Sequence, residues 1–203
     1  MKIKDYFEWL KRDWAKAGLV LAIYLFVMLF VFVREQDYVI FLLLLHTPLY
    51  MLHETEEYLF PGGFLEFFNR RIFGFERADK PLDETFSFVI NVGLVWILLP
   101  LCALLAMGNL NWGLWVPYFS IFAGLSHLAL GIRAKQLYNP GLVVSLLLNI
   151  PVGIWTAWQL AERGVIANPF FNGHLLVGLV ANLLLPVMGV IVYRRYRAEM
   201  QAA

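Results

Sequence analysis

Six long apolar stretches, separated by short polar segments, run through the chain. Each is about 20–24 residues long, which is enough for a helix to cross a hydrocarbon core of about 30 Å. Their approximate bounds are 14–33, 38–60, 84–107, 112–132, 139–161 and 172–193. Tryptophan and tyrosine recur near their ends, where such rings lie at a membrane interface. The pattern predicts an all-α, polytopic membrane protein, a bundle of six transmembrane helices.

Two segments outside these stretches are amphipathic. The first 17 residues set aromatic side chains among lysines and acids, which suits a short helix at the level of the lipid headgroups. The second loop, 61–83, interleaves phenylalanines with Arg70 and Arg71, and predicts an interfacial amphipathic helix. Because little chain remains elsewhere, we expect one integral membrane domain over residues 1–203.

The composition excludes an ordinary soluble domain. Of the 203 residues, 61% are hydrophobic and 15% are charged, against about 45–50% and about 25% in soluble proteins. The positive charges then indicate an orientation, because Lys and Arg are concentrated in cytoplasmic loops. With the amino terminus inside, only Arg34 and Arg163 of the 16 basic residues lie outside. We therefore expect a protein of the inner (plasma) membrane with both termini cytoplasmic.

A run of ionisable residues, His53-Glu54-Thr55-Glu56-Glu57, ends the second apolar stretch. On a helix at about 100° per residue, His53, Glu56 and Glu57 share one face, while Glu54 points about 100° away. Charged side chains at the membrane centre cost roughly 2.5–3.5 kcal/mol each, so such a cluster indicates function. Glu54 is expected to be a solvated residue at the rim.

Polar residues in other stretches lie at matching depths. At about 1.5 Å per residue, His53, Asn91 and His127 are all roughly 8–11 Å from the cytoplasmic side. Since polar groups in lipid turn inward, they predict an off-centre polar pocket open toward the cytoplasm. Asn149 and Asn182 lie deeper, and the expected role of each is a hydrogen bond between helices.

Two further histidines have structural interpretations. His46 is expected to bridge a backbone carbonyl freed by Pro48, and His174 to lie at the outer interface. Aromatic side chains that would line the pocket, if they face inward, are Phe88, Trp96, Phe122 and Trp155.

These residues resemble those of the HXXEE domain-containing membrane proteins. The motif His53 to Glu57 is followed by Asn91 in the next span and His127 in the one after. Residues 138–142, Tyr-Asn-Pro-Gly-Leu, then open the following helix. The family has no settled activity, so the resemblance implies no particular reaction, and the residue pattern itself suggests an enzyme.

The first hypothesis for that enzyme is a metal site. Histidine and carboxylate side chains at i and i+4, with a histidine from another span, suit one divalent ion, zinc or iron. The expected ligands are His53, Glu57 and His127, and the expected catalytic residues are Glu56, Glu57 and Asn91. The substrate would be small and apolar or lipid-like. A variant of the H-E-x-x-H motif would instead make Glu54 the general base of an intramembrane hydrolase.

Three alternatives need no metal or other cofactor. Paired carboxylates and a histidine suit a metal-free acid/base isomerase or cyclase of a lipid-soluble substrate. The line His46, Tyr50, His53 and Glu57 suits a proton-coupled transporter. A structural membrane protein is the third. Expected partners are the lipid bilayer and an apolar small molecule, without nucleic acid, while the reaction and the oligomeric state stay open.

Overall fold

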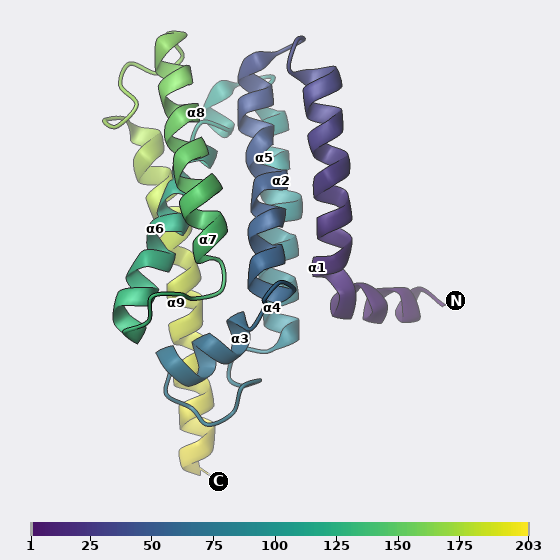
Figure 1. Cartoon of the computed structure of the whole chain (residues 1–203), viewed down its shortest axis with the longest axis vertical. Coiled ribbons are helices and arrows are strands. Elements are labelled where there is room, and N and C mark those ends of the chain that lie inside the picture. The colour runs from purple at the N-terminus through teal and green to yellow at the C-terminus, as the bar shows by residue number, and fades with distance from the viewer. Residues whose placement is uncertain (1, 203) are drawn as a thin grey trace.

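The computed structural model describes residues 2–202, which form helices and loops without a β-strand among them. The all-α prediction is therefore confirmed. Helix α1 (Ile3–Met28) continues into a π-helical turn, η1 (Leu29–Val33). Figure 1 shows its amino-terminal part lying across the direction of the rest. The expected headgroup helix and first span are thus two arms of one bent helix.

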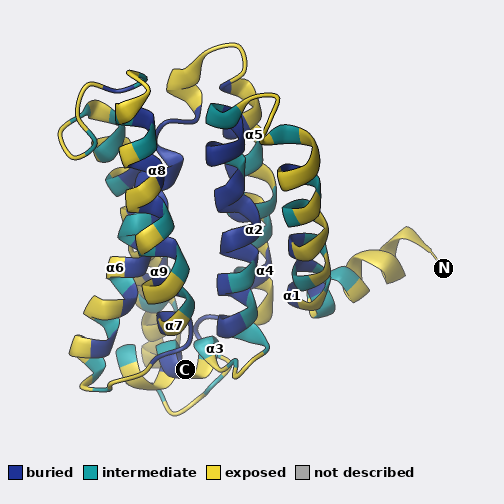
Figure 2. Cartoon of the chain, turned by 45° about the horizontal axis from the view of Figure 1, so that its top comes forward, coloured by how far each residue is buried: buried dark blue, intermediate teal, exposed yellow. Residues whose placement is uncertain are grey.

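Helix α2 (Tyr38–Tyr58) is the centre of the bundle. The Asp37 carboxylate accepts a hydrogen bond from the Ile40 amide (3.0 Å) and caps its start. Its neighbours include α1, α5, α6, η5 and α8. Figure 2 shows α2 buried along most of its length, whereas α1 and α9 have broad exposed faces. The helix that carries the ionisable motif is therefore enclosed by the others.

The remaining helices cover α2 on several sides. The third expected stretch forms α4 (Glu84–Asn91), η3 (Val92–Leu98) and α5 (Leu99–Leu105). A 3-10 turn, η4 (Leu110–Trp112), precedes α6 (Val116–Ala134). The next stretch forms α7 (Leu142–Val144), η5 (Ser145–Asn149) and α8 (Ile150–Glu162), and the last is α9 (Gly173–Ala202). Helix α9 runs well past the expected end at residue 193, because the basic tail continues it.

Five helical stretches, not six, are long and apolar enough to cross a membrane by composition alone. They are Ile3–Val33, Glu84–Leu105, Leu110–Ala134, Leu142–Glu162 and Gly173–Ala202. The expected span 38–60 forms helix α2 but is not among them, so composition supports five of the six expected spans. Its histidines, Pro48 and glutamates reduce its hydropathy. Because these side chains face protein, α2 does not need a lipid-compatible surface.

The second loop is folded against the bundle. It contains the short helical segments α3 (Phe64–Glu66) and η2 (Phe67–Ile72), where the interfacial helix is expected. The buried Asn69 donates from Nδ2 to the carbonyls of Ala78 and Leu82, both at 2.8 Å, and accepts from the Leu82 amide at 3.0 Å. These three bonds fix the return of the loop toward α4.

Most positive charge lies at one end of the bundle. Figure 1 places α3, the end of α6 and the end of α9 at the same end. The two exceptions, Arg34 and Arg163, directly follow η1 and α8 at the other end of the bundle. The Arg163 guanidinium lies 4.3 Å from the centre of the Tyr38 ring. The alternation of loops that the charge pattern requires is therefore present in the fold.

Candidate metal centre

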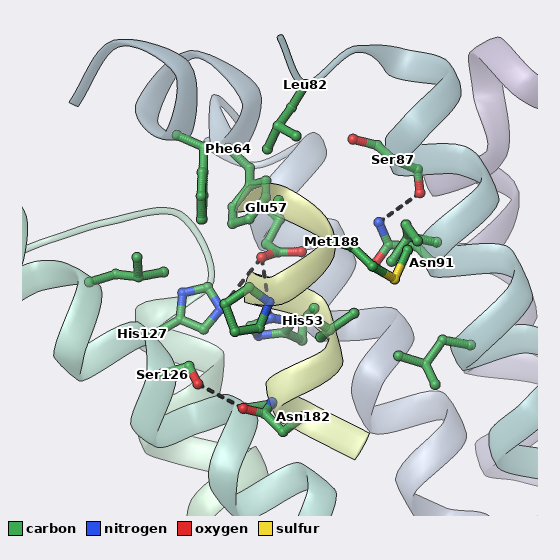
Figure 3. A pocket seen from close by; sticks show the side chains of 18 of the residues that line it. His53, Glu57, Phe64, Leu82, Ser87, Asn91, Ser126, His127, Asn182 and Met188 are labelled. Carbon is green, nitrogen blue, oxygen red and sulfur yellow. Dashed lines mark hydrogen bonds and ion pairs between the residues drawn. The ribbon is translucent and has the colours of Figure 1, made fainter. Parts of the chain in front are cut away.

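Three side chains from α2 and α6 converge beneath α3. Glu57 Oε1 lies 3.5 Å from His53 Nε2 and 3.4 Å from His127 Nε2. One possible ligand atom from each residue lies within 4.8 Å of the other two, and all three residues are buried. Figure 3 shows both imidazoles turned toward the Glu57 carboxylate. These are the three residues that the sequence suggests as ligands.

The spacing of these atoms fits an ion better than a direct hydrogen bond. Direct N–H···O bonds in proteins are about 2.7–3.2 Å long, and both contacts to Glu57 exceed this range. Two ligands about 2.05 Å from a tetrahedral zinc ion would lie about 3.3 Å apart. The two separations from Glu57 are close to that value, and the two histidine ligand atoms lie within 4.8 Å of each other. The three side chains are therefore placed to bind one ion.

Asn139 determines which nitrogen of His127 faces Glu57. Its Nδ2 donates to the His127 carbonyl at 2.9 Å, which leaves its Oδ1 facing His127 Nδ1 at 2.8 Å. Since an amide oxygen only accepts, His127 must carry its proton on Nδ1 when neutral. The Nε2 lone pair is then directed toward Glu57, as required of a metal ligand with an oriented outer hydrogen bond.

His53 is enclosed by Gly141, in the turn that precedes α7, and by Ser145, at the start of η5. The Ser145 hydroxyl lies 3.4 Å from His53 Nδ1, on the ring edge away from Glu57. Gly141 has φ +96°, and a Cβ there would lie 2.5 Å from His127 Cε1 and 2.7 Å from His53 Cε1. Only glycine fits both this backbone conformation and this close approach to the two rings.

Glu56 has a different environment from Glu57. Its two carboxylate oxygens accept hydrogen bonds from the amides of Val143 (3.0 Å) and Val144 (2.7 Å), at the start of α7. A carboxylate is favourable at a helix start, where backbone N–H groups have no helical partner. Glu56 therefore joins α2 to α7, and its catalytic role stays a prediction without a contact to the metal ligands.

Glu54 is buried, and the expectation of a solvated rim residue is wrong. Its Oε2 accepts a hydrogen bond from Trp96 Nε1 at 3.1 Å, and its Oε1 has no partner within the described residues. Glu54 does lie on a different face of α2 from His53 and Glu57, as its position along the helix predicts. That face of α2 is covered by η3 instead of solvent. This arrangement gives no support to Glu54 as a general base beside the two histidines.

A cavity of about 310 Å³ adjoins the three side chains. Its walls come from α2, α4, η3, α6, α9 and the second loop, and they are mainly apolar, as shown by Phe64, Phe86, Leu94, Leu185 and Met188. None of the expected aromatic residues lines it. Phe88 and Trp96 pack toward α1, Phe122 packs in another apolar cluster, and Trp155 is 40% exposed.

Two asparagines lie on the cavity wall. Asn91 donates from Nδ2 to the Tyr58 hydroxyl (3.2 Å) and to the Ser87 carbonyl (2.9 Å). Asn182 accepts at Oδ1 from the Ser126 hydroxyl (2.9 Å), which joins α9 to α6 as expected. The catalytic role of Asn91 stays a prediction, but its position beside the cavity is compatible with contact to a substrate.

A second polar cluster lies deeper in the bundle. His46 is 2.8 Å from the Ser120 hydroxyl at Nδ1 and 3.3 Å from the Thr156 hydroxyl at Nε2. It therefore bridges two side chains from α6 and α8, and not the backbone carbonyl that the sequence suggests. Asn149 is buried and neither of its amide atoms has a partner in the described chain, contrary to the expected interhelical bond. His174, at the start of α9, belongs to neither cluster.

Asn139, Gly141 and Ser145 are the site residues that the sequence analysis did not assign. The first two lie in the turn 138–142, which was noted only for its resemblance to a family. An Asn-Pro-Gly sequence is a turn signal, and a turn that closely follows the stretch with His127 was the available clue. Ser145 carried no comparable signal, because a single serine in a span most often bonds within its own helix.

Comparison with known families assigns the chain. No curated protein and no solved structure matches it. A family described as "Protein of unknown function with HXXEE motif" matches residues 44–156, which is more than half of the 203 residues. The matched region contains all three converging side chains and the turn that supports them. The chain therefore belongs to the HXXEE family.

Proposed function

We propose that this protein is a membrane-embedded enzyme with one divalent metal ion, zinc or iron, bound by His53, Glu57 and His127. The observation that carries the proposal is the convergence of Glu57 Oε1 with the two Nε2 atoms at 3.4 and 3.5 Å. Two neutral imidazoles and one carboxylate are a common catalytic ligand set that leaves a position for substrate or water. The adjoining apolar cavity suits a small apolar or lipid-like substrate.

We further propose that six helices cross the inner (plasma) membrane, with both termini cytoplasmic. Helix α2 has 21 residues, about 31 Å at 1.5 Å per residue, and its neighbours shield its polar side chains. The excess of basic residues at the end with α3 supports a cytoplasmic position for that end. The candidate metal centre would then lie near the cytoplasmic side of the membrane.

Each residue around the site has a distinct proposed part. A bound divalent ion would supply Lewis acidity, which polarises a carbonyl or activates water. Asn139 holds His127 in position through its hydrogen bond to Nδ1, and Ser145 lies beside the Nδ1 edge of His53. Glu56 anchors the start of α7 to α2. Glu57 and Asn91 reach the cavity and are the groups placed to contact a substrate.

The geometry favours this proposal over the metal-free alternatives. A shared proton between Glu57 and either histidine would shorten one contact to hydrogen-bond length, and neither contact is that short. A proton relay would need continuity from His46 to His53. In the structure, the polar partners of His46 are Ser120 and Thr156, so the four residues do not form one hydrogen-bonded line.

The test is the metal content of the purified full-length protein. We expect close to one zinc or iron per chain, and we expect chelation to lower the unfolding temperature, because an ion bound only by the folded state stabilises it. His53→Ala and His127→Ala should each remove both the ion and the effect of the chelator. His174→Ala is the matched control, since this histidine is outside the cluster, and it should leave both unchanged.

Two results would overturn the metal proposal. One is metal content near zero, together with equal unfolding temperatures with and without chelator. The other is retention of the ion by both His53→Ala and His127→Ala. If metal is absent while Glu57→Gln still abolishes turnover of a substrate, the metal-free acid/base enzyme becomes the better explanation.

A further inference from the structure

The cavity beside the candidate metal centre lies between two helices that pack on different neighbours. Its wall on one side is α4 and the start of η3, with Phe86, Ile90 and Leu94, and on the other side α9, with Leu185 and Met188. Helix α4 packs against α1 and η3, whereas α9 packs along α6. The cavity therefore occupies the space between two helices that do not close tightly on each other.

The outer faces of these two helices are apolar and exposed. Val89, next to the cavity residue Ile90, is 57% exposed, and Val187, beside Met188, is 52% exposed. Large exposed apolar side chains along a helix of this hydropathy face lipid in a membrane protein. On each of these two helices, a residue that lines the cavity is therefore next to a residue on the lipid-facing surface.

The second loop covers the cavity from the basic end of the bundle. Phe64, Phe68 and Leu82 line the cavity from this loop, and the Phe64 ring centre lies 6.3 Å from that of His127. The loop is fixed by the three hydrogen bonds of Asn69 and by contact of Phe73 with Tyr193 of α9. An apolar molecule therefore has a more direct route from the bilayer than through this loop.

Two amide groups on the cavity wall have free hydrogen-bonding atoms. Asn182 uses Oδ1 for Ser126, which leaves its Nδ2 donor without a hydrogen bond among the described residues. Asn91 uses Nδ2 for Tyr58 and Ser87, which leaves its Oδ1 acceptor without one. Figure 3 shows Asn91 and Asn182 bordering the same space as His53. The cavity thus offers one donor and one acceptor near the candidate metal centre.

We propose that the cavity binds a single-chain lipid that enters from the bilayer between α4 and α9, with its polar head between Asn91 and Asn182. The head must accept a hydrogen bond from Asn182 Nδ2 and donate one to Asn91 Oδ1, as a fatty amide or a fatty alcohol does. The chain lies along the apolar side chains of α4 and α9. This inference rests on the proposed function, because it names the substrate class of the same site.

The experiment uses the full-length protein in phosphatidylcholine vesicles and a hexadecanamide probe with a photoreactive diazirine in its chain. We expect labelling of α4 and α9 that excess hexadecanamide displaces. The methyl ester of the same chain, which accepts but does not donate, should displace the probe less well by about three- to tenfold. Labelling that neither competitor displaces would overturn the inference.

Matched variants separate the cavity from the outer surface. Asn182→Leu should reduce displaceable labelling about three- to tenfold, while Asn149→Leu, a buried asparagine outside the cavity, should not. Gly189→Leu should also reduce it, because a Cβ at Gly189 meets only Phe73 Cζ, at 3.7 Å, and the longer side chain enters the cavity. Val187→Leu, on the exposed face, is its control and should label like the native protein.

The two proposals fail separately. Should Asn182→Leu not fold, as judged by its unfolding temperature, the comparison of Gly189→Leu with Val187→Leu decides the question. Equal displaceable labelling in that pair would refute the lipid site. Metal content measured on the same samples reports on the proposed function alone: one ion without displaceable labelling refutes only the lipid inference, and displaceable labelling without an ion refutes only the metal.

Discussion

Asn139 is not one of the three candidate ligands, but its hydrogen bond to His127 sets how that histidine can bind an ion. By holding the His127 proton on Nδ1, it directs the Nε2 lone pair toward Glu57. Without this bond the imidazole could rotate or adopt the other tautomer, and a ligand for the proposed ion would be lost part of the time.

The corresponding prediction is that Asn139→Ala weakens metal binding about 10- to 100-fold, as is usual when an outer hydrogen bond to a ligand is removed. Titration of the metal-free protein with zinc, read as the shift in unfolding temperature, measures this. Asn139→Asp keeps an acceptor for Nδ1 and should recover much of the affinity. Asn111→Ala, in an exposed connection, is the control. An Asn139→Ala protein with native affinity would show that the tautomer is set by something else.

At the residue scale, the sequence was informative where residues share a helix. The spacing of His53 and Glu57 places them on one face, and the depth of His127 places it in the same layer. Asn139 and Gly141 lie in a turn, where no helical period relates them to the motif. The partner of Glu54 comes from η3, and which helix lies beside a given face depends on tertiary packing that the pattern does not contain.

The start of α4 is the element whose local stability depends most clearly on charge. The Asp83 carboxylate accepts from the Phe86 amide at 2.9 Å and from Lys80 Nζ at 2.7 Å. Partial burial opposes ionisation of Asp83, but these two hydrogen bonds outweigh it, so its pKa lies below the ordinary value. Ionised Asp83 is therefore favoured more in the folded protein than in the unfolded chain.

The sign of this shift gives a pH dependence. A depressed pKa contributes stability that is present above the unfolded value, about 3.9, and that is lost as the pH falls through the folded value. We expect Asp83→Ala to cost about 0.5–2 kcal/mol at pH 7, as other helix-cap deletions do. The difference from the native protein should shrink below about pH 4. Thermal unfolding at pH 7 and at pH 3 measures it, and a difference that is equal at both would contradict the assignment. Asp83→Asn keeps an acceptor for Phe86 and should lose less.

The sequence predicted where the helices lie, but it did not predict the π-helical turns inside them. Apolar length predicted a helix for each stretch, and the second loop contains helical segments where the interfacial helix is expected. Several helices nevertheless contain π-helical turns, such as η3 and η5. A π-helical turn adds one residue to a turn, which shifts every later side chain by about 100° relative to a regular helix. This shift limits any assignment of faces in the stretches that hold Asn91 and Asn149.

For the whole molecule, the distribution of basic residues predicts a topology that fusion reporters can test. Fusions after Lys80, Lys135 and Ala203 should report the cytoplasm, and fusions after Arg34 and Gly164 should report the outside. The reason is that the loops carrying most Lys and Arg resist transfer across the membrane. A reporter after Lys80 that is found outside would remove α2 from the set of crossing helices and refute the six-helix arrangement.

The arrangement of helices around α2 was beyond the sequence alone. The pattern predicted the number of long helices and the side on which each connection would lie, but many orders of packing satisfy both. What distinguishes them is contact between particular side chains, such as the close approach of α8 to α6 at Gly124, where a Cβ would lie 2.5 Å from Ile150 Cγ1. Only the folded structure identifies such pairs.

The burial of α2 also bears on how the protein is made. Helices enter a membrane from the translocon in order of synthesis, and a helix with several ionisable side chains partitions poorly on its own, at roughly 2.5–3.5 kcal/mol for each charge at the centre. Helix α1 is synthesised first and packs extensively along α2, so it can shield part of α2 from lipid during insertion. If α2 crosses the membrane as proposed, it would depend on α1 to leave the translocon, and residues of α1 far from the candidate metal centre would govern how much protein accumulates.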